Sequence, residues 1–104
     1  MNTNIQLLSD YIGPVRVAYI LRLDRTQDLV SYSPTSWEEK KLLVTLEVVE
    51  GILGEEKWTT LQSWLGGMND YLGDIAPLRV IRDSENLDEI QEVIDAAQYF
   101  IDNG

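Results

Sequence analysis

Apolar residues recur at spacings of three and four along most of this chain, which is the period of an amphipathic helix. The clearest case is residues 36–53, expected to form the longest helix, where two neighbouring apolar stripes run side by side. They consist of Leu42, Leu46, Val49 and Leu53, and of Val44, Val48 and Ile52. An apolar face this wide predicts a helix that is covered on most of its surface. Gly54 is expected to end it.

Four short segments have the spacing of a helix N-terminal capping box, in which a capping side chain is followed three residues later by Glu or Gln. They are Thr3–Gln6, Asp24–Gln27, Ser36–Glu39 and Asn86–Glu89. The box at Asn86 opens the last helix, which Asn103 and Gly104 are expected to cap. Residues 15–21 are also compatible with a strand because they are rich in β-branched side chains. The whole pattern predicts an all-α fold, a compact helical bundle of about six helices.

The chain length of 104 residues predicts one domain, 1–104, with two parts. Residues 1–34 are expected to form a helix-turn-helix-like part, since Gly13-Pro14 separates two helices and a tight turn is expected near Leu23. Residues 35–104 form the remaining helical part. An alternative is that the helix pair of the first part serves only for packing.

Charge divides the chain unevenly. Residues 1–41 carry five basic and five acidic side chains, whereas residues 42–104 carry three basic and thirteen acidic ones. The net charge of −10 therefore falls entirely in the second segment. An acidic surface repels nucleic acid and anionic membranes and suits a basic protein partner. The simpler interpretation is that the acidic residues keep the chain soluble.

Candidate chemistry is sparse. The chain has no cysteine and no histidine, which removes thiolate chemistry and the commonest general base. No nucleophile has a visible base partner, so we expect no catalytic residue, metal or cofactor and no enzymatic activity. No apolar run is long enough to span a membrane, and the first ten residues lack the features of a secretion signal. A cytoplasmic protein is therefore expected.

The stretch from Trp58 to Asp83 is the best candidate for a binding site. A helix is expected to end at Gly66-Gly67 in left-handed backbone geometry, before a polar, glycine-containing turn and a new helix at Pro77. Aromatic and methionine side chains around such a bend are typical of protein contacts. The candidate partner-binding residues are Trp64, Met68, Asn69, Tyr71, Leu72, Gly73, Ile75 and Pro77.

A second hypothesis is DNA binding through the helix-turn-helix-like part. The first turn of a recognition helix meets base edges in the major groove. The candidate residues are Arg16, Arg22, Arg25, Thr26 and Gln27. Asp24 and Asp28 flank this set and oppose phosphate binding, so the net charge argues against DNA.

The segments WLGGMNDYLGDIAPLRVI and VIDAAQYFIDNG resemble the toxin-binding domain of Xre/MbcA/ParS-type antitoxins. The motif is carried by Trp64-Leu65, Asn69, Leu72-Gly73 and Pro77-Leu78. Upstream, IGPVRVAYILRLDRTQDLVSY is similar to the degenerate helix-turn-helix that precedes that domain. The chain departs from the family pattern in its acidic recognition segment. It also carries Arg82-Asp83-Ser84-Glu85 where glycine is common.

The resemblance implies an all-helical antitoxin-like protein. Its C-terminal part would bind and neutralise a RES-type toxin, an enzyme that consumes NAD, and its N-terminal part would form a homodimer. A third possibility is a stand-alone oligomeric helical module, in which the nearly all-round apolar helix at 42–53 completes its core by dimerising.

Overall fold

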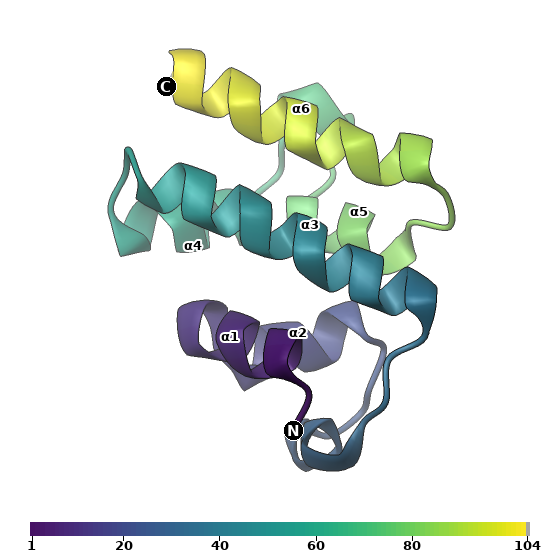
Figure 1. The fold of residues 1–104 in the computed structure, drawn as a ribbon. Coiled ribbons are helices and arrows are strands. Elements are labelled where there is room, and N and C mark those ends of the chain that lie inside the picture. The colour runs from purple at the N-terminus through teal and green to yellow at the C-terminus, as the bar shows by residue number, and fades with distance from the viewer. Residues whose placement is uncertain (104) are drawn as a thin grey trace.

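The computed structural model describes residues 1–103, and within that range it contains helices and no strands (Figure 1). The all-α prediction is confirmed, and the possible strand at 15–21 is wrong, because those residues lie mostly in a helix. Gly104, half of the predicted cap of the last helix, lies outside the described residues. The elements in chain order are α1 (Thr3–Ile12), α2 (Pro14–Ile20), η1 (Thr26–Ser31), α3 (Ser36–Leu53), α4 (Trp58–Gly66), η2 (Asp70–Leu72), α5 (Pro77–Asp83) and α6 (Leu87–Asn103), where η marks a 3₁₀-helix.

Helix α3 is the centre of the bundle. It packs against α1, α4 and α6, and Figure 1 shows it between the α1–α2 pair and α6. Leu42, Val49 and Ile52 are fully buried, as the two apolar stripes predict. Because helices of this same chain cover α3, its wide apolar surface does not require a second copy.

The helix N-termini are capped one residue earlier than predicted at two of the four boxes. Asn2, not Thr3, caps α1 and accepts hydrogen bonds from the backbone N–H groups of Asn4 and Ile5. Thr35, not Ser36, caps α3 in a box with Glu38. The reason is tertiary, since the carboxylate of Glu39 accepts hydrogen bonds from the amides of Asn2 and Asn4 at 2.6 and 2.9 Å.

The other two boxes have different outcomes. Asn86 accepts a hydrogen bond from the backbone N–H of Glu89 at 3.0 Å, as predicted. The box at Asp24 is wrong, because η1 begins after Arg25 and has no capping side chain. Only Leu29 is buried in η1, so little apolar burial is available to stabilise a longer α-helix there. Ser33-Pro34 then prevents extension.

The turn after α2 is tight, as predicted. Arg22 has φ of +59° and lies in the left-handed region. The N–H of Leu23 donates to the carbonyl of Ala18 at 2.9 Å and that of Arg22 to Tyr19 at 3.2 Å. These two bonds define a Schellman motif, a helix end in which glycine is the usual left-handed residue.

None of the helices within residues 1–103 has the length and apolarity needed to cross a bilayer.

Candidate functional site

The wall of the candidate site begins where α4 ends. Gly67 has φ of −89° and ψ of 158°, so the predicted left-handed geometry at Gly66-Gly67 is wrong. Glycine is needed there for a different reason. A Cβ atom on Gly67 would lie 2.7 Å from the carbonyl oxygen of Ser63, which is closer than real Cβ contacts allow. The same carbonyl accepts a hydrogen bond from the N–H of Gly67 at 2.9 Å. The chain therefore turns tightly against the end of α4.

Asn69 fixes the turn that follows. Its side-chain oxygen accepts a hydrogen bond from the N–H of Tyr71 at 2.9 Å, as the sequence predicts for an asparagine at this position. Its backbone carbonyl accepts from Leu72 at 3.0 Å and from Asp74 at 2.8 Å. Gly73 has φ of +69° and ends η2 in the left-handed conformation. Asn69 thus holds the six-residue turn from Asn69 to Asp74, and Gly73 occupies a left-handed position where a side chain is disfavoured.

A groove lies between this turn and the C-terminal half of α6. Its volume is about 380 Å³, and two aromatic pairs line it. The rings of Tyr71 and Tyr99 lie 5.5 Å apart, and those of Trp64 and Phe100 lie 6.1 Å apart. Both pairs are tilted, a favourable geometry for aromatic contacts. We call this surface the aromatic groove. Its lining residues are Trp64, Met68, Asn69, Asp70, Tyr71, Ala96, Tyr99, Phe100 and Asn103.

The most exposed apolar side chains of the groove come from the turn and from α6. Met68 is 83% exposed, Tyr71 is 52% exposed and Tyr99 is 56% exposed. Scattered apolar residues are normal on protein surfaces, but a contiguous set that includes Met and two tyrosines indicates an interaction surface.

The structure brings half of the eight predicted residues together in the aromatic groove. These are Trp64, Met68, Asn69 and Tyr71. The other four do not line it. Leu72 and Pro77 are buried, Gly73 shapes the backbone, and Ile75 lines a separate groove of about 260 Å³ between α5 and α6.

The sequence prediction did not include the α6 side of the groove, formed by Tyr99, Phe100 and Asn103. Phe100 belongs to the inner apolar face, but Tyr99 is exposed on a helix whose exposed residues are mostly polar. An exposed aromatic on an acidic helix is the signal that could have identified it. Its position opposite Tyr71 depends on tertiary packing.

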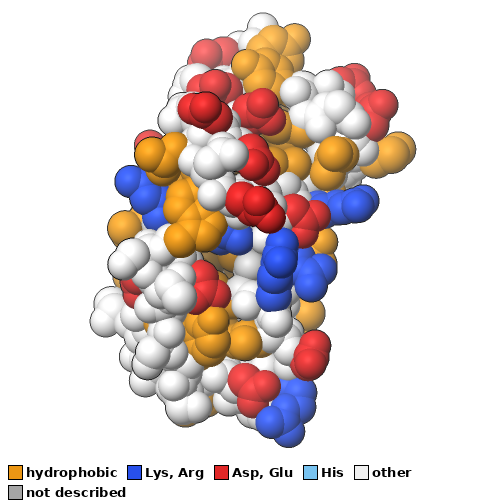
Figure 2. All heavy atoms as spheres, turned by 90° about the vertical axis from the view of Figure 1, so that its right-hand side faces the viewer, with side chains coloured by type: hydrophobic (Ala, Val, Ile, Leu, Met, Phe, Trp, Pro, Cys, Tyr) orange, Lys and Arg blue, Asp and Glu red, His pale blue; other side chains and the backbone are white. Residues whose placement is uncertain are grey.

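Negative charge surrounds the groove. Asp70 lines it directly. Asp95 and Asp102 lie four residues before and three residues after Tyr99, and such positions are neighbours on a helix surface. Figure 2, a view of another face, shows most of its acidic side chains toward the α6 end of the molecule, whereas basic ones lie in the middle and at the opposite end. The rim of the groove therefore favours a basic partner.

The three arginines of the DNA-binding hypothesis all have intramolecular partners. Arg16 donates to the carbonyl of Ile12 at 3.0 Å, across the break between α1 and α2. Arg22 pairs with Asp83 at 3.4 Å, and Arg25 pairs with Asp28 at 3.0 Å. Thr26 and Gln27 begin η1, which is a 3₁₀-helix of six residues. Phosphate binding would have to compete with these intramolecular contacts.

Among residues 1–103, no group of three acidic side chains is placed to hold a metal ion. Comparisons of the chain with known protein families, curated proteins and solved structures found no match. The class of protein that fold and site define is an all-helical protein with an aromatic, acid-rimmed surface groove.

Proposed function

We propose that this protein is an antitoxin-like protein that binds and neutralises a partner protein through the aromatic groove. The observation that carries the proposal is the exposure of Met68, Tyr71 and Tyr99 on one surface. Methionine and aromatic side chains provide much of the binding energy in protein interfaces, because they bury a large area at small entropic cost. The hydrogen bonds of Asn69 hold the turn in one shape before binding, which reduces the cost of ordering it.

The chemistry of the surface defines the partner. An apolar side chain would enter between Met68 and the two tyrosines, while basic residues around it would face Asp70, Asp95 and Asp102. Charge complementarity of this kind accelerates association and weakens as salt concentration rises. We therefore expect a partner whose contact surface has an apolar centre and a basic rim.

The resemblance to Xre/MbcA/ParS-type antitoxins supports a RES-type toxin as that partner, acting in the cytoplasm. The shared motif covers Trp64, Asn69 and Gly73, which form the wall and the turn of the groove. The same resemblance supports a homodimer through the N-terminal part. Leu7, Val15 and Val30 are exposed there and are available for such a contact.

The test is co-expression with the product of the neighbouring gene, followed by affinity purification and a measurement of toxicity. We expect a stable complex and relief of toxicity. Met68→Ala and Tyr99→Ala should each weaken the complex by at least ~10-fold, which corresponds to ~1.4 kcal/mol and is typical of interface anchors. Because both side chains are exposed, the helical circular dichroism signal should not change.

Leu43→Ala is the matched control. Leu43 is an exposed apolar residue of α3 outside the groove, so its removal should leave affinity unchanged. The proposal fails if no neighbouring gene product forms a complex. It also fails if Met68→Ala and Tyr99→Ala bind as tightly as Leu43→Ala.

A further inference from the structure

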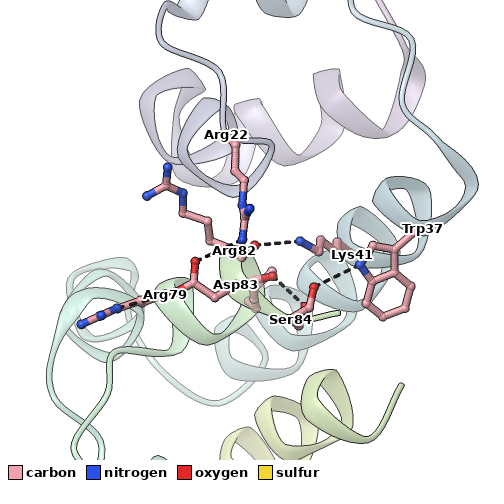
Figure 3. A network of polar contacts seen from close by, with 8 residues as sticks. Arg22, Trp37, Lys41, Arg79, Arg82, Asp83 and Ser84 are labelled. Atoms are coloured by element: carbon pink, nitrogen blue, oxygen red, sulfur yellow. Dashed lines mark hydrogen bonds and ion pairs between the residues drawn. The ribbon is translucent and has the colours of Figure 1, made fainter. Parts of the chain in front are cut away.

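Arg22, Arg79 and Arg82 come from the end of α2 and from α5, and none of them lines the aromatic groove (Figure 3). Arg22 and Arg79 share the carboxylate of Asp83, at 3.4 and 3.6 Å. The guanidinium of Arg82 lies over the ring of Tyr19, 4.6 Å from its centre. We call this the arginine corner. A single carboxylate is thus the side-chain ion-pair partner of two arginines, and the third, Arg82, precedes Asp83 in the sequence.

The backbone of Arg22 is not explained by stability. It occupies the left-handed position of the Schellman motif at φ of +59°, where a side chain costs about 1 kcal/mol or more relative to glycine. Its ion pair with Asp83 does not offset that cost. Both side chains are about half exposed, at 55% and 52%, and exposed pairs contribute only ~0–1 kcal/mol. Glycine would serve the fold better at this position, so the guanidinium needs another explanation.

Capping of α5 does not supply that explanation. The carbonyls at the end of α5 already have donors in Lys41, Trp37 and Ser84 (Figure 3). Lys41 donates to the carbonyl of Arg82 at 2.8 Å, and Trp37 donates to that of Ser84 at 3.1 Å. The arginine side chains make no such bond. The Nε of Arg82 is buried and has no hydrogen-bond partner in the described structure.

The corner is also electropositive, in a chain whose net charge is −10. Burial lowers the pKa of the Lys41 ammonium, and the positive charge of Arg22 lowers it further. Arg82 acts in the same direction, whereas Glu38 and Asp83 act in the opposite one. Arg22 and Arg82 of the corner thus act on this buried ammonium, and Asp83 opposes them.

We propose that the arginine corner binds a small ligand through a phosphoryl group. The phosphoryl oxygens would take the place of the Asp83 carboxylate as the anionic partner of Arg22 and Arg79. Guanidinium groups bind phosphate as well as carboxylate groups, and the single contacts of Asp83 with Arg22 and Arg79 mark where the anion would lie. The three arginines and Asp83 leave two positive charges at the corner, which a doubly charged phosphoryl group would neutralise.

The surroundings favour a small ligand over nucleic acid. Arg79 also lines the groove between α5 and α6 that contains Glu89 and Glu92. An extended polyanion would have to pass such acidic side chains, and tight binding of nucleic acid needs several phosphate contacts. A compact ligand makes its contacts at the corner alone.

The test uses pyrophosphate as the probe and the melting temperature of the full chain as the readout, at constant ionic strength set with sodium chloride. Millimolar pyrophosphate should raise the melting temperature of the parent, because ligand binding to the native state stabilises it. Arg22→Gly should melt at the same or a higher temperature without pyrophosphate, since glycine suits the Schellman position. Its affinity for pyrophosphate should fall by at least ~10-fold. Asp83→Asn should bind pyrophosphate more tightly, because the competing carboxylate loses its charge.

Arg25→Gln is the matched control, because Arg25 pairs with Asp28 outside the corner and its loss should leave the response to pyrophosphate unchanged. The proposal is overturned if pyrophosphate gives the parent no more stabilisation than sodium chloride, or if Arg22→Gly responds as the parent does. A duplex oligonucleotide forms the second arm. Binding of the duplex through Arg22 without any response to pyrophosphate would overturn the small-ligand proposal in favour of DNA. None of these outcomes bears on the aromatic groove, which is tested separately with the protein partner.

Discussion

Gly66 and Gly67 are adjacent, yet the structure predicts opposite effects when each is replaced by alanine. Gly66 is the last residue of α4, and a Cβ atom there would have no neighbour within 4 Å. Gly67 is the next residue, and its Cβ would lie 2.7 Å from the backbone oxygen of Ser63. The two variants have the same chemical change and differ only in local geometry.

The magnitudes follow from those two environments. Gly66→Ala should stabilise the protein by ~0.5–1 kcal/mol, because alanine loses less backbone entropy than glycine in a helix. Gly67→Ala should destabilise it by ~1–3 kcal/mol, since the contact is with backbone and can be relieved only by moving the chain. For a domain of this size, 1 kcal/mol corresponds to about 4–8 °C in melting temperature. We expect a rise of roughly 2–8 °C for Gly66→Ala and a fall of at least ~4 °C for Gly67→Ala.

Thermal unfolding followed by circular dichroism measures both shifts, and partner binding provides a second readout. Gly67→Ala should displace Met68 and Asn69 and so weaken the complex, whereas Gly66→Ala should leave it intact. The reasoning is refuted if the two variants change the melting temperature in the same direction.

Two further predictions concern the turn and the tyrosines. Gly73→Val should reduce partner binding by at least ~10-fold while the protein stays helical, because a β-branched residue resists the φ of +69° at this position. Gly73→Asn is the control, since asparagine tolerates that geometry. Equal affinity of Gly73→Val and the parent would place the contact elsewhere. The second prediction concerns Tyr32. Its hydrogen bond to Glu38, assisted by burial, raises the pKa of the Tyr32 hydroxyl from 10.0 to about 12. The stability that this hydrogen bond contributes is therefore complete below pH 10 and is lost as pH rises through about 12. Spectrophotometric titration should show this late ionisation in the parent but not in Tyr32→Phe, and its persistence in the variant would contradict the assignment.

Local signals in the sequence were enough for much of the fold. The apolar period defined α3 from Ser36 to Leu53 and its buried stripes, and Gly13-Pro14 marked the break between α1 and α2. Asn86 capped α6 as expected. These features depend on interactions within about four residues, which the sequence lists directly.

Errors arose where a distant contact competed with a local one. The spacing from Ser36 to Glu39 predicted a capping box. The Glu39 carboxylate instead accepts hydrogen bonds from the side-chain amides of Asn2 and Asn4, which lie 37 and 35 residues away in the sequence. At Gly67 the sequence indicated that glycine is needed but not why. A Cβ atom there would lie too close to the Ser63 carbonyl oxygen, whereas the φ of Gly67 is negative and open to any residue.

The candidate sites divide in the same way. The sequence determined that Trp64, Met68, Asn69 and Tyr71 surround one bend, because the bend is local. Only the tertiary structure decided that Tyr99 and Phe100 complete the groove, that Ile75 faces another surface, and that Arg22 meets Asp83 across 61 residues. Periodicity assigns a residue to a face of its own helix. Which face of another helix lies opposite depends on how all the helices pack together, and that arrangement has no local signal.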